Sequence, residues 1–342
     1  MSDPRQNSEW AVALDGGTTN TRARLVCDGR VVATARRPWG VRDTVLSTGG
    51  LRLADAVREC IEEVRRAASP DRPLRIVAAG MLSSEMGLCH VPHLEAPAGL
   101  AELARGVVLA NLPEVADEPI AFVPGVRTPP GPGVEGWTVV DVMRGEECST
   151  LGAWLALGRP GASVFLWPGS HTKLIQVDAD GRIVRSHSTL AGELTAAVAG
   201  HTLLAASLPD DLPENLDPDA VAAGVRLAQR QGLGRAAFAV RLADLSHALD
   251  PQQRAAFWIS AVAAVDVADL ANHPILNDKA PVWVGGSQPR RGLYASLLAR
   301  RHLGHVATLE DDLAEQAAAL GAVAIVGGSK SPAPGAGVGR KK

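Results

Sequence analysis

Apolar residues along the chain recur with two different periods, which predicts that strands and helices alternate. Residues 9–14 lead into a short strand that places Asp15 at its end. Over residues 50–67, apolar side chains such as Val57 and Ile61 recur at helical spacing opposite a charged side. The same patterns predict strands over 75–79, 120–123, 137–142, 163–167 and 281–284, and helices over 146–157, 193–207, 218–231, 236–248, 252–271, 292–301 and 310–326. This alternation indicates a mixed α/β architecture with functional sites at strand ends.

Two segments, residues 15–32 and 168–184, resemble each other. They align without a gap, with Gly17 on Gly169 and Asp28 on Asp180. Each begins with a turn rich in Gly, Ser, Thr and Asn, continues as a strand, and reaches an Asp-Gly pair that favours a tight hairpin. Glycines leave backbone N–H groups accessible and hydroxyl groups add donors, so each first turn is expected to hold a phosphate. Two such hairpins indicate two related halves that bind one polyphosphate; chance similarity of short hairpins is the alternative.

Composition and charge narrow the class of protein. The 342 residues suit two domains, and 46% hydrophobic with 21% charged residues is ordinary for a globular protein. A net charge of −3 gives no electrostatic reason to expect nucleic acid or an anionic membrane as partner. No apolar run reaches the length of a membrane span, and the N-terminus lacks the apolar core of a signal peptide.

The cysteines and the tail complete this picture. The four cysteines are widely spaced without a C-x-x-C pair, which argues against disulfides or a thiolate metal site and suits a cytoplasmic location: Cys27, Cys60, Cys89 and Cys148. Residues 329–342 are rich in Pro and Gly and are expected to be a disordered tail. The oligomeric state stays open, a homodimer included.

The common phosphate-binding fingerprints are absent from the sequence. There is neither a G-x-x-x-x-G-K-[ST] loop nor a G-x-G-x-x-G motif. Asp15-Gly16-Gly17 is therefore expected to bind phosphate in another way.

Four motifs carry a resemblance to a known family. An acidic residue followed by Gly-Gly-Thr-Thr-Asn, a second glycine–hydroxyl hairpin and a late Gly-Gly-Ser resemble the sugar kinase/actin/Hsp70 ATPase superfamily. Within it, the chain resembles the 2-dehydro-3-deoxygalactonokinase family over roughly residues 9–327. The motifs are DGGTTNTR at 15–22, GMLSS at 80–84, VMRGEE at 142–147 and PGSHTK at 168–173.

The resemblance implies a fold and an activity. The fold is two ribonuclease-H-like domains that flank a central nucleotide and substrate cleft, with residues 1–145 in the first domain and 146–328 in the second. The activity is ATP-dependent phosphorylation of 2-dehydro-3-deoxy-D-galactonate at its 6-hydroxyl, a step of galactonate breakdown. ATP, Mg²⁺ and a sugar acid are the implied ligands.

Candidate nucleotide residues follow from the two turns and the late glycines. Asp15 is expected to order Mg²⁺ through water, because Mg²⁺ keeps much of its hydration and uses few carboxylates; a turn-capping Asp is the alternative. Gly285, Gly286 and Ser287 allow close backbone approach to a base or ribose, against a plain strand-to-helix turn. The phosphate-binding candidates are Gly16, Gly17, Thr18, Thr19, Asn20, Gly169, Ser170, His171, Thr172 and Lys173. The alternative for Thr18, Thr19 and Asn20 is that they are ordinary turn residues. His171 could equally be a half-exposed turn histidine, and Lys173 a solvated lysine.

Candidate substrate residues must include donors for a carboxylate. Arg22 and Arg144 could bind it bidentately, while Ser83 and Ser84 offer hydroxyl groups. The alternative for Arg22 is that its side chain simply faces solvent.

The resemblance to sugar kinases implies a carboxylate base at a helix start shortly before the second turn, which here is the helix at 146. The order of choice is Glu146, then Glu147, then Asp141 on the preceding strand. Two glutamates in a first helical turn also complement the helix dipole and need have no other role.

Other functions fit the same fold. A kinase of another sugar acid or polyol is one. A non-catalytic sugar-sensing regulator is another, although the roughly eight residues before the first strand are too few for a helix-turn-helix. A chaperone-like or filament-forming ATPase is the third.

Overall fold

The computed structural model describes residues 9–41, 50–67, 74–209, 213–276, 279–302 and 304–327. The expected tail at 329–342 lies outside the described residues. Contacts divide the chain into two units. Unit 1 comprises Met1–Gly161, Asp178–Arg185 and Glu315–Lys342, and unit 2 comprises Ala162–Val177 and Ser186–Ala314.

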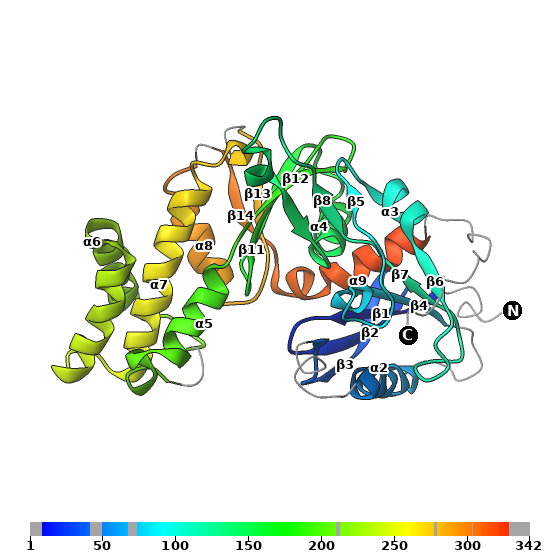
Figure 1. The fold of residues 1–342 in the computed structure, drawn as a ribbon, viewed down its shortest axis with the longest axis horizontal. Coiled ribbons are helices and arrows are strands. Elements are labelled where there is room, and N and C mark those ends of the chain that lie inside the picture. The colour runs from blue at the N-terminus through cyan, green and yellow to red at the C-terminus, as the bar shows by residue number, and fades with distance from the viewer. Residues whose placement is uncertain are drawn as a thin grey trace, which may run out of the picture. The chain divides into compact units, whose positions relative to one another are not determined.

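Unit 1 is built on a six-stranded sheet with the order β3-β2-β1-β4-β7-β6 (Figure 1). Strands β1, β2 and β3 are antiparallel, whereas β4 and β7 continue the sheet parallel to β1. The bounds are β1 Trp10–Gly16, β2 Thr21–Cys27, β3 Arg30–Arg37, β4 Arg75–Gly80, β7 Ile120–Phe122 and β6 Val108–Ala110. The apolar side of helix α2 (Gly50–Arg65) packs on this sheet, with Val57 and Ile61 in the core as its spacing predicted.

A smaller sheet in unit 1 has the order β5-β8-β9. Its strands are β5 Leu94–Glu95, β8 Val126–Thr128 and β9 Asp141–Met143, and α3 (Leu100–Gly106) lies between β5 and β8 in the chain. The strand predicted over 137–142 is wrong in its first half, where Gly136–Val139 forms a 3-10 turn. Trp137 is 73% exposed there, so the apolar residues that suggested a strand have no core to pack against.

Unit 2 repeats the strand order of unit 1. Its sheet has the order β12-β11-β10-β13-β14, with β10 and β11 antiparallel and β13 and β14 parallel to β10. The bounds are β10 Ser163–Trp167, β11 Thr172–Val177, β12 Ile183–Thr189, β13 Val282–Val284 and β14 Val306–Thr308. The repeated hairpins predicted from the sequence are confirmed, and each sheet has the ribonuclease-H-like order.

The two hairpins differ by one residue. In β1 and β2, Gly16 pairs with Thr21, while in β10 and β11, Trp167 pairs with Lys173. The second turn is therefore one residue longer, so the gapless alignment holds for β2 and β11 but shifts by one residue in the strands before them.

Helix α4 (Glu146–Ala156) belongs to unit 1, which differs from the boundary expected after residue 145. It packs closely on helix α9 (Asp311–Gly327): a Cβ added at Gly152 would lie 2.0 Å from the Ala317 carbonyl oxygen. A Cβ at Gly321 would lie 1.9 Å from the Cys148 carbonyl oxygen. Because small residues let the two backbones approach, α4 and the greater part of α9 stay with unit 1.

Helices form the rest of unit 2. They are α5 Ala191–His201, α6 Pro218–Leu245, α7 Pro251–Leu270 and α8 Arg290–Leu298. The helix predicted over 193–207 ends at His201 and is followed by a 3-10 turn, Leu203–Ala206. Gly232 has φ 81° and interrupts α6, close to the gap predicted between helices at 218–231 and 236–248.

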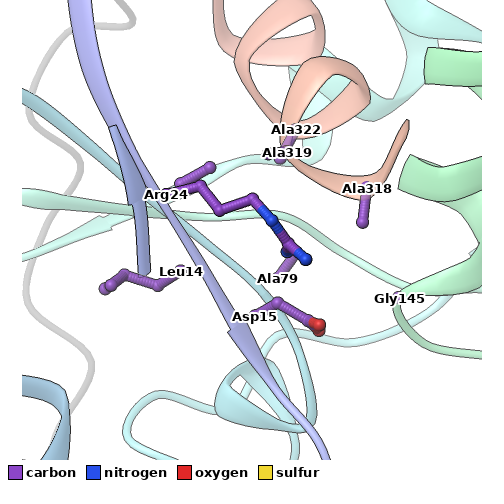
Figure 2. Close-up of a pocket in the computed structure, with 9 residues that line it drawn as sticks. Leu14, Asp15, Arg24, Ala79, Gly145, Ala318, Ala319 and Ala322 are labelled. Carbon is purple, nitrogen blue, oxygen red and sulfur yellow. The ribbon is translucent and has the colours of Figure 1, made fainter. Parts of the chain in front are cut away.

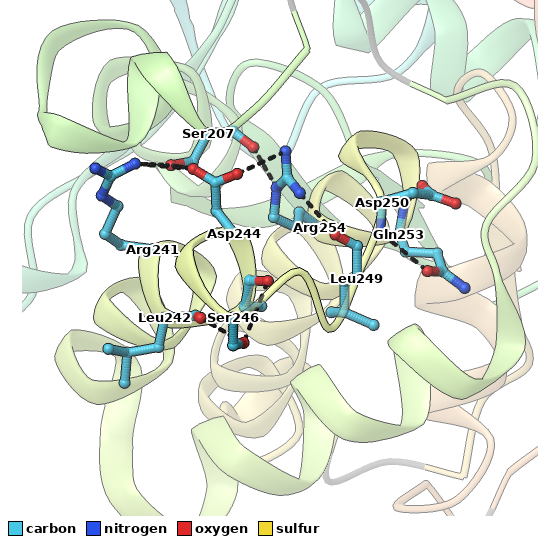
Figure 3. A network of polar contacts seen from close by, with 10 residues as sticks. Ser207, Arg241, Leu242, Asp244, Ser246, Leu249, Asp250, Gln253 and Arg254 are labelled. Carbon is cyan, nitrogen blue, oxygen red and sulfur yellow. Dashed lines mark hydrogen bonds and ion pairs between the residues drawn. The ribbon is translucent and has the colours of Figure 1, made fainter.

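Buried Arg254 on α7 holds these helices together (Figure 3). Its Nε donates to the Ser207 carbonyl at 2.6 Å and its Nη1 to the Leu249 carbonyl at 2.6 Å. Asp244 on α6 lies 3.3 Å from Arg254 Nη2 and accepts from Ser207 Oγ at 2.7 Å. This network fixes the ends of α6 and α7 and uses no residue of the predicted site.

Candidate active site

The first turn lies between β1 and β2 in unit 1. The Gly17 N–H donates to the Asn20 carbonyl at 2.8 Å and closes the turn. Thr18 and Thr19 are exposed, as groups that donate to a ligand must be. The Asn20 side chain is engaged by the protein, because its Oδ1 accepts from Arg36 Nε and Nη2 at 3.1 and 2.9 Å. Arg36 on β3 was not among the predicted site residues.

Asp15 lies at the end of β1 with about a third of its side chain exposed. Arg22 is its cross-strand partner, and Arg22 Nη1 lies 4.0 Å from Asp15 Oδ2. Gly80, with φ 67°, ends the neighbouring strand β4, and a Cβ there would lie 3.0 Å from Asp15 Oδ1 and 2.6 Å from the Gly16 carbonyl oxygen. Only glycine fits this approach, so the backbone of β4 limits where the Asp15 carboxylate can lie.

A small pocket opens beside Asp15 within unit 1 (Figure 2). Buried Arg24 extends its guanidinium into this pocket, and burial lowers the pKa of Arg24. Arg24 Nη2 lies 3.7 Å from Glu315 Oε1. Asp15 and Arg24 are the charged residues of the pocket lining, and the other lining residues are glycine, alanine and leucine: Ala13, Leu14, Ala79, Gly145, Ala318, Ala319 and Ala322. The ends of β1 and β4 and the start of α4 therefore meet at Asp15.

Arg144 holds the loop that follows β4 rather than an open position. Its Nη1 donates to the Ser83 carbonyl at 2.7 Å and to Ser83 Oγ at 2.8 Å. Its Nη2 donates to the Val91 carbonyl at 2.8 Å and lies 3.3 Å from His93 Nδ1. Both terminal nitrogens are therefore engaged by the loop, and the guanidinium lies among the loop's carbonyl groups.

Ser83 and Ser84 are likewise used inside this loop. Ser83 is fully buried and its Oγ donates to the Gly80 carbonyl at 3.0 Å. Ser84 Oγ donates to the Met81 carbonyl at 2.7 Å, within the 3-10 turn Met81–Ser83 and its C-cap. Both hydroxyl groups therefore donate within the loop.

The two glutamates at the start of α4 differ in their surroundings. Glu147 is fully buried, and both of its carboxylate oxygens accept the Gly145 N–H at 2.8 Å. Burial, with a smaller contribution from the charge of Glu146, raises the pKa of Glu147 to about 7. Glu146 is half-buried, and its Oε2 accepts the Arg144 backbone N–H at 3.2 Å. Asp141 is half-buried on β9, opposite Thr128 of β8.

The second turn lies between β10 and β11 in unit 2. Ser170 is exposed, whereas Thr172 and Lys173 are buried. Lys173 Nζ donates to Ser188 Oγ at 2.6 Å, so the solvated lysine considered from the sequence is wrong. Thr172 Oγ1 lies 3.4 Å from the buried Tyr294 hydroxyl, so the Thr172 side chain faces the interior rather than a ligand.

His171 is the remaining ionisable side chain of this turn. It is half-exposed, and its Nε2 lies 3.1 Å from Glu193 Oε1 at the start of α5. Glu193 was not predicted. Extending the gapless repeat would have pointed to it, because Gly40-Val41 and Gly192-Glu193 align at the same offset.

The glycines at 285 and 286 lie beside the second turn, within unit 2. A Cβ at Gly285 would lie 2.1 Å from Trp167 Cζ3, and one at Gly286 would lie 2.8 Å from the Pro168 carbonyl oxygen. Gly286 also has φ 81°. The glycines bring the start of α8 next to the second turn, and Ser287 is exposed there.

Other kinds of site receive no support. Within residues 9–327, as far as they are described, no three His, Cys, Asp or Glu side chains gather in a group that could hold a metal ion. In that same part of the chain, no helix combines the length and apolar character needed to span a membrane. Four cysteines of the described chain form no disulfide: Cys27, Cys60, Cys89 and Cys148.

The repeated strand order, with a glycine- and hydroxyl-rich turn after the first strand of each sheet, defines the two-unit ATPase class to which sugar kinases and actin belong. The chain matches the family model of 2-keto-3-deoxy-galactonokinase over residues 15–325 and belongs to that family.

Two similar proteins accompany this match. The chain is 33% identical over 200 residues to the Rhizobium meliloti (strain 1021) protein named Probable 2-dehydro-3-deoxygalactonokinase DgoK1. That alignment covers 57% of this chain and spans 58% of the relative's length. The structure is similar to a Sinorhizobium meliloti crystal structure assigned provisionally as a 2-dehydro-3-deoxygalactonokinase. Its TM-score is 0.69 at 24% identity, over 92% of this chain and 97% of that one, which supports the fold.

Proposed function

We propose that this protein is a kinase that uses ATP to phosphorylate 2-keto-3-deoxy-galactonate at its 6-hydroxyl. The observation that carries the proposal is the family match over residues 15–325, which includes both turns, Arg144-Gly145-Glu146-Glu147 and Gly285-Gly286-Ser287. Two ribonuclease-H-like units, each with an exposed hydroxyl on its turn, support the same conclusion. We also propose a cytoplasmic location, because widely spaced cysteines without a C-x-x-C pair suit a reducing compartment.

ATP and Mg²⁺ fit the residues present. Asp15 is a partly exposed carboxylate at a strand end, without a cluster of further acids in the described chain, and Mg²⁺ prefers few carboxylates together with water and phosphate oxygens. Asp15 would hold Mg²⁺. The phosphates would accept hydrogen bonds from the hydroxyl groups of Thr18, Thr19 and Ser170. The adenosine would contact Gly285–Ser287. Bound Mg²⁺ would neutralise charge that develops on the transferred phosphoryl group.

Arg22 and Glu146 are proposed to act on the sugar acid. Arg22 is partly exposed, and its loose contact with Asp15 at 4.0 Å leaves its guanidinium able to bind the substrate carboxylate. Glu146 would accept the proton of the 6-hydroxyl as that oxygen bonds to the γ-phosphorus and the bond to ADP breaks. Glu147 is less suited, because its carboxylate is fully buried and bound to Gly145.

A panel of 2-keto-3-deoxy acids and polyols, followed by coupled ADP release, tests the proposed substrate. The proposal expects the galacto epimer to give the highest kcat/KM. A polyol or another sugar acid that is turned over faster would support the alternative of a same-fold kinase with another substrate. No ADP release with any of these compounds would favour the non-catalytic sensor.

A further inference from the structure

In each unit, the segment after the third strand contacts the turn between the first two strands. In unit 1, a Cβ at Gly40 would lie 2.4 Å from the Thr18 carbonyl oxygen, and the Val41 N–H donates to the Gly17 carbonyl at 3.2 Å. In unit 2, a Cβ at Gly192 would lie 1.9 Å from the Gly169 carbonyl oxygen. The Glu193 N–H donates to the Ser170 carbonyl at 2.9 Å. The pairs Gly40-Val41 and Gly192-Glu193 share the offset of the repeat, whereas the turn residues that they contact are exchanged, in keeping with the extra residue in the second turn.

The side chains at the second position of this pair differ. Val41 is an apolar residue that is 1% exposed in the core of unit 1. Glu193 is half-exposed, and its carboxylate lies 3.1 Å from His171 Nε2. The repeat aligns His171 with Thr19, so unit 2 carries an ionisable pair where unit 1 has a threonine and a valine. The backbone contacts alone need no carboxylate, since Val41 provides them in unit 1.

The contact between Glu193 and His171 is held from the backbone as well. Glu193 binds the turn through its N–H, and Gly192 brings its backbone against Gly169, so the main chain of Glu193 is fixed relative to the turn. An exposed ion pair between free side chains contributes little, because two flexible groups must be ordered. Here the backbone contact between Glu193 and Ser170 already orders the main chain from which the Glu193 side chain extends.

We propose that Glu193 is a positioning residue that orients His171 toward the phosphates of ATP. The proposal rests on the proposed phosphate-binding function of the second turn. His171 Nε2 faces Glu193 at 3.1 Å, so this contact holds the imidazole ring within the turn and leaves Nδ1 outside the contact.

Glu193→Val tests this directly, because it places in unit 2 the residue that the same backbone carries in unit 1. We expect the KM for MgATP to rise roughly tenfold, the size of losing one charge-assisted hydrogen bond, with the KM for the sugar acid within about twofold of wild type. Glu193→Gln keeps an oxygen acceptor and is expected to restore most of the loss. Asp219→Ala, which removes an exposed acid from the first turn of α6, is the matched control and should leave both KM values unchanged.

The double variant His171→Asn/Glu193→Val separates the inference from the function on which it rests. If Glu193 acts through His171, the double variant is no weaker toward MgATP than His171→Asn alone. Effects that add in full, or a Glu193→Val enzyme with wild-type KM for MgATP while His171→Asn is impaired, would overturn the positioning role. If His171→Asn and Ser170→Ala both leave MgATP binding unchanged, the phosphate-binding function of the turn fails instead. Calorimetric binding of MgATP and thermal unfolding of each variant distinguish a lost contact from a lost fold.

Discussion

Glu147 accepts the N–H of Gly145 on both carboxylate oxygens, each at 2.8 Å, from within the first turn of its own helix. The contact caps α4 and fixes Gly145, whose Cβ position would lie 3.2 Å from the Gly80 Cα. Through Gly145, Glu147 therefore helps to hold the start of α4 against Gly80, the residue at the end of β4 that limits where the Asp15 carboxylate can lie. Because Glu147 is buried, ionising its carboxyl group costs free energy, and the stability of the fold should therefore depend on pH.

The first prediction concerns pH. Burial raises the pKa of Glu147 to about 7, well above its value near 4.5 in an unfolded chain. The folded state therefore binds the Glu147 proton more tightly than the unfolded state does. The contribution of this proton to the free energy of unfolding is complete below pH 4.5 and is lost as pH rises through 7. Glu147→Gln removes this dependence. In urea denaturation, we expect the variant to gain up to about 3 kcal/mol relative to wild type between pH 5 and pH 8. A difference that stays constant with pH would contradict the buried, protonated carboxyl.

The second prediction separates the two glutamates in catalysis. Glu146→Gln removes the proposed base and should slow the phosphoryl-transfer step about 10²–10⁴-fold in single-turnover kinetics, with binding of both substrates retained. Glu147→Gln keeps an oxygen for Gly145 and should lower that rate far less. The reverse ranking would make Glu147 the base despite its burial.

The third prediction compares two arginines. Arg144→Gln removes hydrogen bonds to Ser83 and Val91 and should lower the free energy of unfolding by about 1.5–3 kcal/mol. Both KM values should change, because the loop loses its anchor. Arg22→Gln should raise the KM for the sugar acid alone and leave the melting temperature near that of wild type. A stable Arg144→Gln protein with only a raised sugar-acid KM would return Arg144 to the substrate.

The fourth prediction uses two glycines with similar φ angles. Gly80→Ala places a methyl group 3.0 Å from Asp15 Oδ1 at φ 67°, whereas Gly29→Ala has φ 74° and no atom within 4 Å. Both variants carry the strain of a positive φ, and this strain is larger at Gly80, where ψ is −147°. Only Gly80→Ala should also lower kcat, because it displaces the carboxylate. Equal activity in the two variants, measured at saturating substrates, would show that the position of Asp15 has little influence on turnover.

The sequence predicted those parts of the fold that depend on local pattern. The hairpins after Asp15 and Gly169 follow from alternating apolar positions and Asp-Gly turns, and α2 follows from helical spacing. The one-residue difference between the turns was not predictable, since it depends on which residues pair across the strands.

Site details depend on contacts between distant segments, which pattern does not contain. Arg144 reaches Ser83 and Val91, about 60 and 50 residues away, so its engagement with the loop appears only in the folded unit. Lys173 is polar and aligns with Thr21, yet tertiary packing buries it against Ser188. Glu193 had a sequence signal in the offset of the repeat, but its meaning requires the contact with His171.

The most direct measurement of the central claim is the fate of the phosphoryl group. The purified protein is incubated with MgATP and 2-keto-3-deoxy-galactonate, and the products are followed by ³¹P NMR. The account predicts equimolar ADP and a phosphomonoester coupled to the protons of carbon 6, with turnover reduced at least about 100-fold in Asp15→Asn. Release of inorganic phosphate without a sugar phosphate, or full activity in Asp15→Asn, would contradict it.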